Sequence, residues 1–148
     1  MLGTRVFVFI LATVCAASAA LATADPAKRR HELMEEVGDA AKPVGKMLRG
    51  ERAFDAAIAL QSFETMRDVA AVVGDLFPEG SYSGDEDTAK ETVWSDREGF
   101  NKRLSKFTDD IAAAIAANPQ SLETFEPVAS AVFRNCKACH EEYRIPGD

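Results

Sequence analysis

Cysteine and histidine are scarce in this chain of 148 residues, which contains three cysteines and two histidines. Cys15 lies in an N-terminal segment that we expect to be removed, as argued below, so the mature chain keeps only Cys136 and Cys139. Both belong to one short motif, and no cysteine remains for a structural disulfide bond. A structural zinc site would need a second Cys/His pair, and outside this motif the chain offers only His31.

Positively charged residues are also fewer than negatively charged ones. The chain has 17 lysines and arginines against 24 aspartates and glutamates, a formal net charge of −7. Such an acidic surface disfavours nucleic acids and anionic membranes, so neither is expected as a partner. It favours encounter with a basic region on a partner protein, an attraction that weakens as the salt concentration rises.

The first 24 residues have the features of a cleaved signal peptide. Arg5 supplies the positive charge, residues 6–17 form an apolar stretch too short to span a bilayer comfortably, and Ala22-Thr23-Ala24 precedes Asp25 as a small-residue cleavage site. Cleavage after Ala19 or after Ala22 also fits. Loss of Arg5 changes the net charge from −7 to −8. We expect an exported mature protein of residues 25–148 without a membrane span.

No segment of the mature chain alternates between apolar and polar residues as a β-strand does. Four segments instead repeat apolar residues at helical spacing, at about residues 27–48, 54–77, 91–117 and 121–145. Pro43 is expected to kink or split the first segment, and Pro127 to bend the fourth or mark its effective start. Residues 78–88 are expected to form a loop. Four helices of about 20 residues with short connections predict an all-α fold, an antiparallel up-down four-helix bundle.

The most informative motif is Cys136-Lys137-Ala138-Cys139-His140, a C-x-x-C-H string in the fourth helical segment. Positions i, i+3 and i+4 of a helix project from one face, so both thiols and the imidazole can meet one flat macrocycle. This is the attachment pattern of c-type haem, with two thioether bonds and a histidine ligand to the iron. A thioredoxin-like site would need a βαβ pattern, and a plain disulfide would leave His140 unexplained.

Three stretches of the chain resemble the class II c-type cytochromes, whose best-known members are the cytochromes c prime. They are residues 136–144 (CKACHEEYR), residues 49–57 (RGERAFDAA) and residues 93–96 (VWSD). The resemblance spans essentially the whole mature chain. It implies a four-helix bundle holding one covalent haem c, with His140 as the proximal ligand and with homodimers common among the members. It also matches Arg30 to an arginine that pairs with a haem propionate, and Arg144 to one near the proximal haem face.

The sixth iron ligand divides this family by function. In the resemblance Met34 occupies the distal position, and its surroundings look more like the branch in which a methionine sulfur binds the iron. A thioether ligand favours ferrous iron and suits an electron carrier. A methionine on the apolar stripe of a helix is also ordinary core packing. His31, one turn away, is the rival ligand, although the helical period directs it mostly toward solvent.

We therefore predict a periplasmic electron-transfer protein, not an enzyme, because no nucleophile–base arrangement is present. Its haem would be held by Cys136 and Cys139, with His140 and Met34 as axial ligands. Phe77 and Trp94 are expected as pocket walls. A redox protein with a basic docking surface is the expected partner. Two alternatives stay open: a five-coordinate haem protein that binds nitric oxide or carbon monoxide, and a helical dithiol or metal-binding protein without haem.

Overall fold

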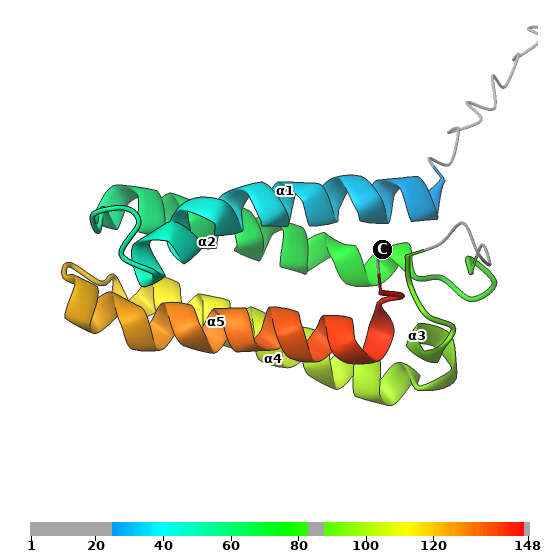
Figure 1. The fold of residues 1–148 in the computed structure, drawn as a ribbon. Helices are drawn as coiled ribbons and strands as arrows, with labels where there is room; N and C mark the ends of the chain where they lie inside the picture. Colours follow the sequence, from blue (N-terminus) through cyan, green and yellow to red (C-terminus); the bar gives the residue numbers. More distant parts are fainter. Residues whose placement is uncertain (1–24, 83–87, 147–148) are drawn as a thin grey trace, which may run out of the picture.

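Four long helices run side by side in the computed structural model, which describes residues 25–82 and 88–146. They are α1 (Pro26–Leu48), α2 (Ala56–Val73), α4 (Arg97–Ala117) and α5 (Leu122–Tyr143), with a short 3-10 turn η1 (Gly74–Leu76) and a short helix α3 (Thr92–Ser95). Successive long helices run in opposite directions, and α1 starts at the same end at which α5 finishes (Figure 1). The predicted all-α, antiparallel up-down bundle is confirmed. The predicted signal peptide, residues 1–24, lies outside the described residues.

Local sequence sets the helix starts. Asp25 caps α1 by accepting a hydrogen bond from Ala27 N at 3.0 Å, and Pro26 occupies the first turn. Ser121 and Thr124 form a capping box at the start of α5. Pro43 and Pro127 lie inside continuous helices, so neither splits its helix and Pro127 does not mark the start of α5. Packing of each helix against its neighbours outweighs the single backbone hydrogen bond that a proline removes.

The predicted third helix is wrong in one respect, because residues 91–117 are divided at Asp96 into α3 and α4. Asp96 leaves the helical conformation, with φ −117° and ψ 58°, and its carboxylate accepts a hydrogen bond from Gly99 N at 3.1 Å. This is an N-cap, which starts a new helix in a new direction. The second helix is also shorter than predicted, because Asp55 caps it and the 3-10 turn ends it.

The buried apolar residues form two clusters, one toward each end of the bundle. In the half near the α1–α2 and α4–α5 connections, large apolar side chains from all four long helices are fully buried; they are Val44, Met47, Phe63, Met66, Ile111, Phe125 and Val132. At the other end a smaller cluster holds Ala89, Val93, Phe100 and Tyr143. Within the described residues no helix is long and apolar enough to cross a membrane.

Candidate haem site

A cavity of about 440 Å³ opens in the half of the bundle where the main core ends. The first half of α1, the end of α2, the first half of α4 and the last half of α5 all contribute to its lining, as the antiparallel arrangement requires. Most of its wall is apolar; the large apolar members are Val37, Val73, Phe77, Val93, Phe100, Leu104, Phe107 and Phe133. The cavity is therefore built mainly by the helices of the bundle, with a smaller contribution from the segment between η1 and α3.

The C-x-x-C-H residues line this cavity from α5, and Met34 lines it from α1. Burial raises the pKa of Cys136, and raises that of Cys139 to about 11. Burial thus stabilises the neutral thiols relative to the thiolates. Burial, followed by the charge of Arg144, lowers the pKa of His140 and so favours the neutral imidazole that binds a metal.

Met34 differs from the other large apolar side chains that stay exposed. The described part of the chain has four exposed large apolar side chains, which are Met34, Val72, Tyr82 and Leu122. Met34 alone among them lines the cavity. It is 37% exposed, whereas its neighbours on the apolar stripe, Leu33 and Val37, are 3% and 8% exposed. Met34 therefore faces the cavity and is not part of the packed core.

Arg30 is buried, 5% exposed, at the edge of the same cavity. Its Nη1 donates to Leu76 O at 2.7 Å and its Nη2 donates to Ser81 O at 3.2 Å. The guanidinium also lies over the rings of Phe77 and Trp94, 4.9 and 5.5 Å from their centroids. Arg30 thus ties α1 to the last residue of η1 and to the segment that follows it, and keeps a positive charge beside the cavity.

Two more arginines line the cavity, Arg103 of α4 and Arg144 at the end of α5. Nε and Nη2 of Arg103 each lie 3.2 Å from Oε2 of Glu142. Glu35 is the one carboxylate in the lining. The cavity wall therefore carries an excess of positive charge, although the chain as a whole is acidic.

These residues fit a haem c. The apolar walls suit the macrocycle, two cysteines at positions i and i+3 suit its two vinyl groups, and the arginines suit its propionate carboxylates. The donor set also contains an imidazole and a thioether, both of which are axial ligands of haem iron. No group of three or more potential metal-binding side chains occurs in the described residues that would point to a metal site of another kind.

Comparisons with known proteins agree with this fit. The family model described as Cytochrome C' matches residues 25–144. A cytochrome c' of Rhodopseudomonas palustris is 32% identical over 127 residues, which cover 84% of this chain and 85% of that protein. The chain belongs to the cytochrome c' family. Its cofactor is accordingly covalent haem c.

Other members of the cytochrome c' family are similar at lower identity. A cytochrome c-556 of Agrobacterium fabrum is 25% identical over 131 residues, covering 88% of each chain. The solved structure of cytochrome c' from Rhodopseudomonas palustris superposes with a TM-score of 0.78 at 27% identity, covering 84% of this chain and 98% of that one. A nitric oxide complex of a cytochrome c prime variant from Alcaligenes xylosoxidans superposes with a TM-score of 0.72 over 82% of this chain and 94% of that one; at 24% identity it shows the fold alone.

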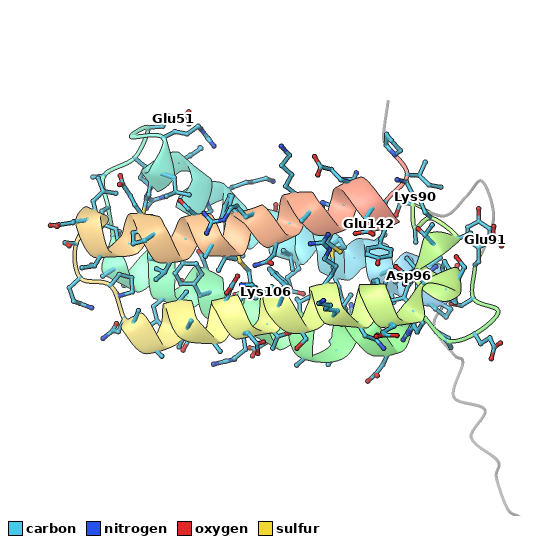
Figure 2. All side chains as sticks on the ribbon, turned by 90° about the horizontal axis from the view of Figure 1, so that it is seen from below. Glu51, Lys90, Glu91, Asp96, Lys106 and Glu142 are labelled. Atoms are coloured by element: carbon cyan, nitrogen blue, oxygen red, sulfur yellow. The ribbon has the colours of Figure 1, made fainter. Side chains whose placement is uncertain are left out.

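In this cytochrome c' family member residues 88–92, which lead into α3, hold the end of the C-x-x-C-H helix. Figure 2 shows Lys90 and Glu142 together at that end of the bundle. Four hydrogen bonds join the segments: Lys90 N to Tyr143 O (2.9 Å), Ile145 N to Thr88 O (2.8 Å), Lys90 Nζ to Glu141 O (2.8 Å) and Thr92 Oγ1 to Glu142 O (3.1 Å). Three of them satisfy the carbonyls of Glu141, Glu142 and Tyr143, which the last turn of α5 would leave unpaired, and so fix the turn that carries His140.

Tyr143 links the end of α5 to the start of α4. Its ring is buried, 4% exposed, and lines the cavity, and its hydroxyl donates to Asp96 Oδ2 at 2.8 Å. Asp96 is also the N-cap of α4, so one carboxylate serves both interactions. Burial and the hydrogen bond to Asp96 both raise the pKa of Tyr143.

This raised pKa predicts a loss of stability at alkaline pH. Above about pH 10 the tyrosine of the unfolded chain loses its proton while folded Tyr143 keeps it, so the free energy of unfolding falls by up to about 1.4 kcal/mol per pH unit. In Tyr143→Phe this slope should be absent. Denaturant unfolding between about pH 9 and pH 11 measures it. Tyr82→Phe removes the other tyrosine hydroxyl, which is exposed, as a control; equal slopes in wild type and Tyr143→Phe would contradict the prediction.

The other predicted site residues fall in different places. Phe77 lines the cavity as expected, whereas Trp94 does not and packs behind it, with ring centroids 5.9 Å apart. The His31 side chain is 62% exposed, in line with its predicted direction, but it also lines the cavity.

Sequence reasoning missed Arg103 and Asn135. Asn135 lines the cavity and donates to Asp110 Oδ2 at 2.6 Å, and the hydrogen bonds from Lys106 and then Asn135 lower the pKa of Asp110. Lys106 and Asp110 pair along α4, and Lys106 is seen beside α5 in Figure 2. Polar residues in helical segments resemble solvent-facing ones, so no signal in the sequence marks their position at the cavity.

Proposed function

We propose that this cytochrome c' family member is a periplasmic one-electron carrier. Cys136 and Cys139 would hold the haem by thioether bonds, and His140 and Met34 would be the axial ligands of its iron. One observation carries the proposal: the C-x-x-C-H helix and Met34 line the same cavity from two different helices. The predicted signal peptide supports export, and the haem supplies the change of oxidation state.

The surroundings of Met34 support a role as ligand. Its side chain extends into the cavity, although leucine and valine neighbours on the same helix are buried. A neutral thioether favours ferrous iron and raises the reduction potential relative to a second imidazole. With Met34 and His140 both held by helices of a packed bundle, little rearrangement would accompany gain or loss of one electron.

The other residues of the site would orient the haem and exclude water. The apolar wall lowers the polarity around the haem. The arginines that line the cavity, including Arg30, would balance the charges of the haem propionates. The acidic net charge of −7 favours a redox partner with a basic docking surface, and we propose this class of partner. A homodimer also fits the family resemblance.

Absorption spectra of the oxidised and reduced protein test Met34 as a ligand. We expect low-spin haem with a sulfur-to-iron charge-transfer band in the oxidised form. Met34→Leu keeps the side chain volume but removes the sulfur, so this band should disappear and the reduction potential should fall. Met66→Leu is the matched control, because Met66 is fully buried and does not line the cavity. A band that persists in Met34→Leu would overturn the assignment.

A second candidate function is the binding of small gases by a five-coordinate haem. Its support comes from a relative: a cytochrome c' of Alcaligenes xylosoxydans is 29% identical to this chain over 99 residues, and a cytochrome c prime variant from Alcaligenes xylosoxidans forms a complex with nitric oxide. In that case Met34 would pack near the iron without binding it. High-spin spectra of the wild-type protein that change on addition of carbon monoxide would favour this function over electron transfer.

A further inference from the structure

Both histidines of the 148-residue chain line the same cavity. His140 belongs to the C-x-x-C-H motif, whereas His31 lies on α1, three residues before Met34, and is not one of the two axial ligands proposed above for the native protein. We propose that His31 is a reserve axial ligand, which binds the iron in place of Met34 when the Met34 sulfur is lost. This proposal rests on the proposed function in one respect: both assume that the side of the haem opposite His140 faces Met34.

The helix geometry puts His31 within reach of the distal position. Three residues of an α-helix correspond to a separation of about 60° around the axis and about 4.5 Å along it. Side chains also lean toward the N-terminus of a helix, so His31 lies over the turn before Met34. A rotation of the first turns of α1, together with a slide of less than one turn, would therefore carry the imidazole to the place of the thioether.

Little holds the His31 side chain where it is. It is 62% exposed, and its Nε2 lies 3.5 Å from Oε1 of Glu35. Glu35 is itself 68% exposed, and a polar contact between two exposed side chains contributes little to stability. Binding of the imidazole to iron would thus cost no buried hydrogen bond of His31.

The rest of the lining offers no comparable ligand. The three arginines cannot give up their protons, the cysteines are committed to the haem, and His140 is the proximal ligand. Tyr143 also lines the cavity, but its hydroxyl donates to Asp96 Oδ2 at 2.8 Å and is therefore engaged elsewhere. Glu35 supplies the one carboxylate in the lining, but imidazole is a better ligand for haem iron than a carboxylate is. His31 is thus the nitrogen ligand that the cavity holds in reserve.

Arg30 explains why Met34 and not His31 would bind in the intact protein. The hydrogen bonds from Arg30 to Leu76 O and Ser81 O fix the turn of α1 that precedes Met34. The movement that brings His31 to the iron would strain these bonds. Replacement is therefore favourable only when the competing sulfur is missing, and it would lower the reduction potential, because imidazole stabilises ferric iron more than a thioether does.

Three holoprotein variants test the proposal: Met34→Ala, His31→Ala and the double variant. Electron paramagnetic resonance of the ferric proteins at about pH 8, above the ordinary pKa of histidine, reports the ligands. We expect Met34→Ala to stay low-spin with the signals of two imidazole ligands and without the sulfur-to-iron band. The double variant should be high-spin, and His31→Ala should match the wild type. A high-spin Met34→Ala, or a low-spin double variant, would overturn the proposal.

The outcomes separate this proposal from the proposed function. A wild-type protein without the sulfur-to-iron band would refute Met34 as the native ligand. The reserve role of His31 is judged separately, by the difference between Met34→Ala and the double variant. Alanine is the best helix former, so the substitution should preserve α1, and circular dichroism checks this. If Met34→Ala did not fold, Met34→Ser with and without His31→Ala would be read in the same way.

Discussion

Replacement of both Cys136 and Cys139 by alanine is expected to give a protein without covalent haem that no longer holds the native bundle. The cofactor cavity has a volume of about 440 Å³, and at roughly 24 cal/mol per Å³ an unfilled apolar cavity of this size costs up to about 10 kcal/mol. This equals or exceeds the whole free energy of unfolding of many domains, about 5–15 kcal/mol. Haem staining of the denatured protein and circular dichroism measure the two effects.

Lys137→Ala is the matched control for this double variant. Lys137 lies between the two cysteines on α5, and its side chain is 78% exposed, so its removal should leave both haem attachment and stability unchanged. The single variant Cys136→Ala retains one thiol for a thioether bond and should hold haem through denaturation. A double variant with native helix content and an unchanged midpoint of unfolding would show that the bundle does not depend on its cofactor.

The helices of this protein could be predicted from the sequence because their apolar stripes are long and regular. Ala59, Phe63, Met66, Ala70 and Val73 on α2 and Phe125, Ala129 and Val132 on α5 have the spacing of one helix face, and these residues form part of the core. The caps at Asp25 and Ser121 could likewise be read from local residues. The spacing of apolar residues does not reveal where one helix ends and another begins within a segment, because the residues before and after the break both keep helical spacing.

Asp96 illustrates this limit. An aspartate between Trp94 and Phe100 reads as one exposed position of a continuous helix. The structure instead uses its carboxylate twice, as the cap of α4 and as the acceptor for Tyr143 from the distant end of α5. The second contact joins residues 47 positions apart, so no local window contains it. Tertiary contacts of this kind decide between a surface aspartate and a helix start.

The candidate site was predictable to the extent that its chemistry is local. Cys136, Cys139 and His140 are recognised by spacing alone, whereas Met34 was assigned through the family resemblance. His31 shows where helical periodicity is insufficient. Its side chain is exposed, as the period predicts, yet it lies at the rim of the cavity because α1 borders the opening. An exposed helical position can therefore still belong to a site when the helix itself forms the wall.

The second large effect is expected at Gly99, in the first turn of α4. A Cβ atom at this position would lie 2.6 Å from the Tyr143 hydroxyl oxygen and still closer to the Asp96 carboxylate. Gly99→Ala must therefore displace the side chain that caps α4 and the acceptor of a buried tyrosine hydroxyl. Loss of the cap costs about 1 kcal/mol, and an unsatisfied buried hydroxyl about 1–3 kcal/mol, so we expect a destabilisation of about 2–4 kcal/mol.

Denaturant unfolding of the holoprotein, followed by circular dichroism, measures the change in the free energy of unfolding. Two further variants serve as comparisons that show its cause. Tyr143→Phe removes only the hydroxyl and leaves the cap, so it should cost about 1 kcal/mol, less than Gly99→Ala. Glu98→Ala changes the neighbouring exposed residue and should stay within about 0.5 kcal/mol of the wild type. If Gly99→Ala also stayed within that range, Asp96 could move without loss, and the link between the end of α5 and the start of α4 would not stabilise the protein. A large effect of Gly99→Ala together with a smaller one of Tyr143→Phe would instead show that one carboxylate holds both helix ends beside the cavity.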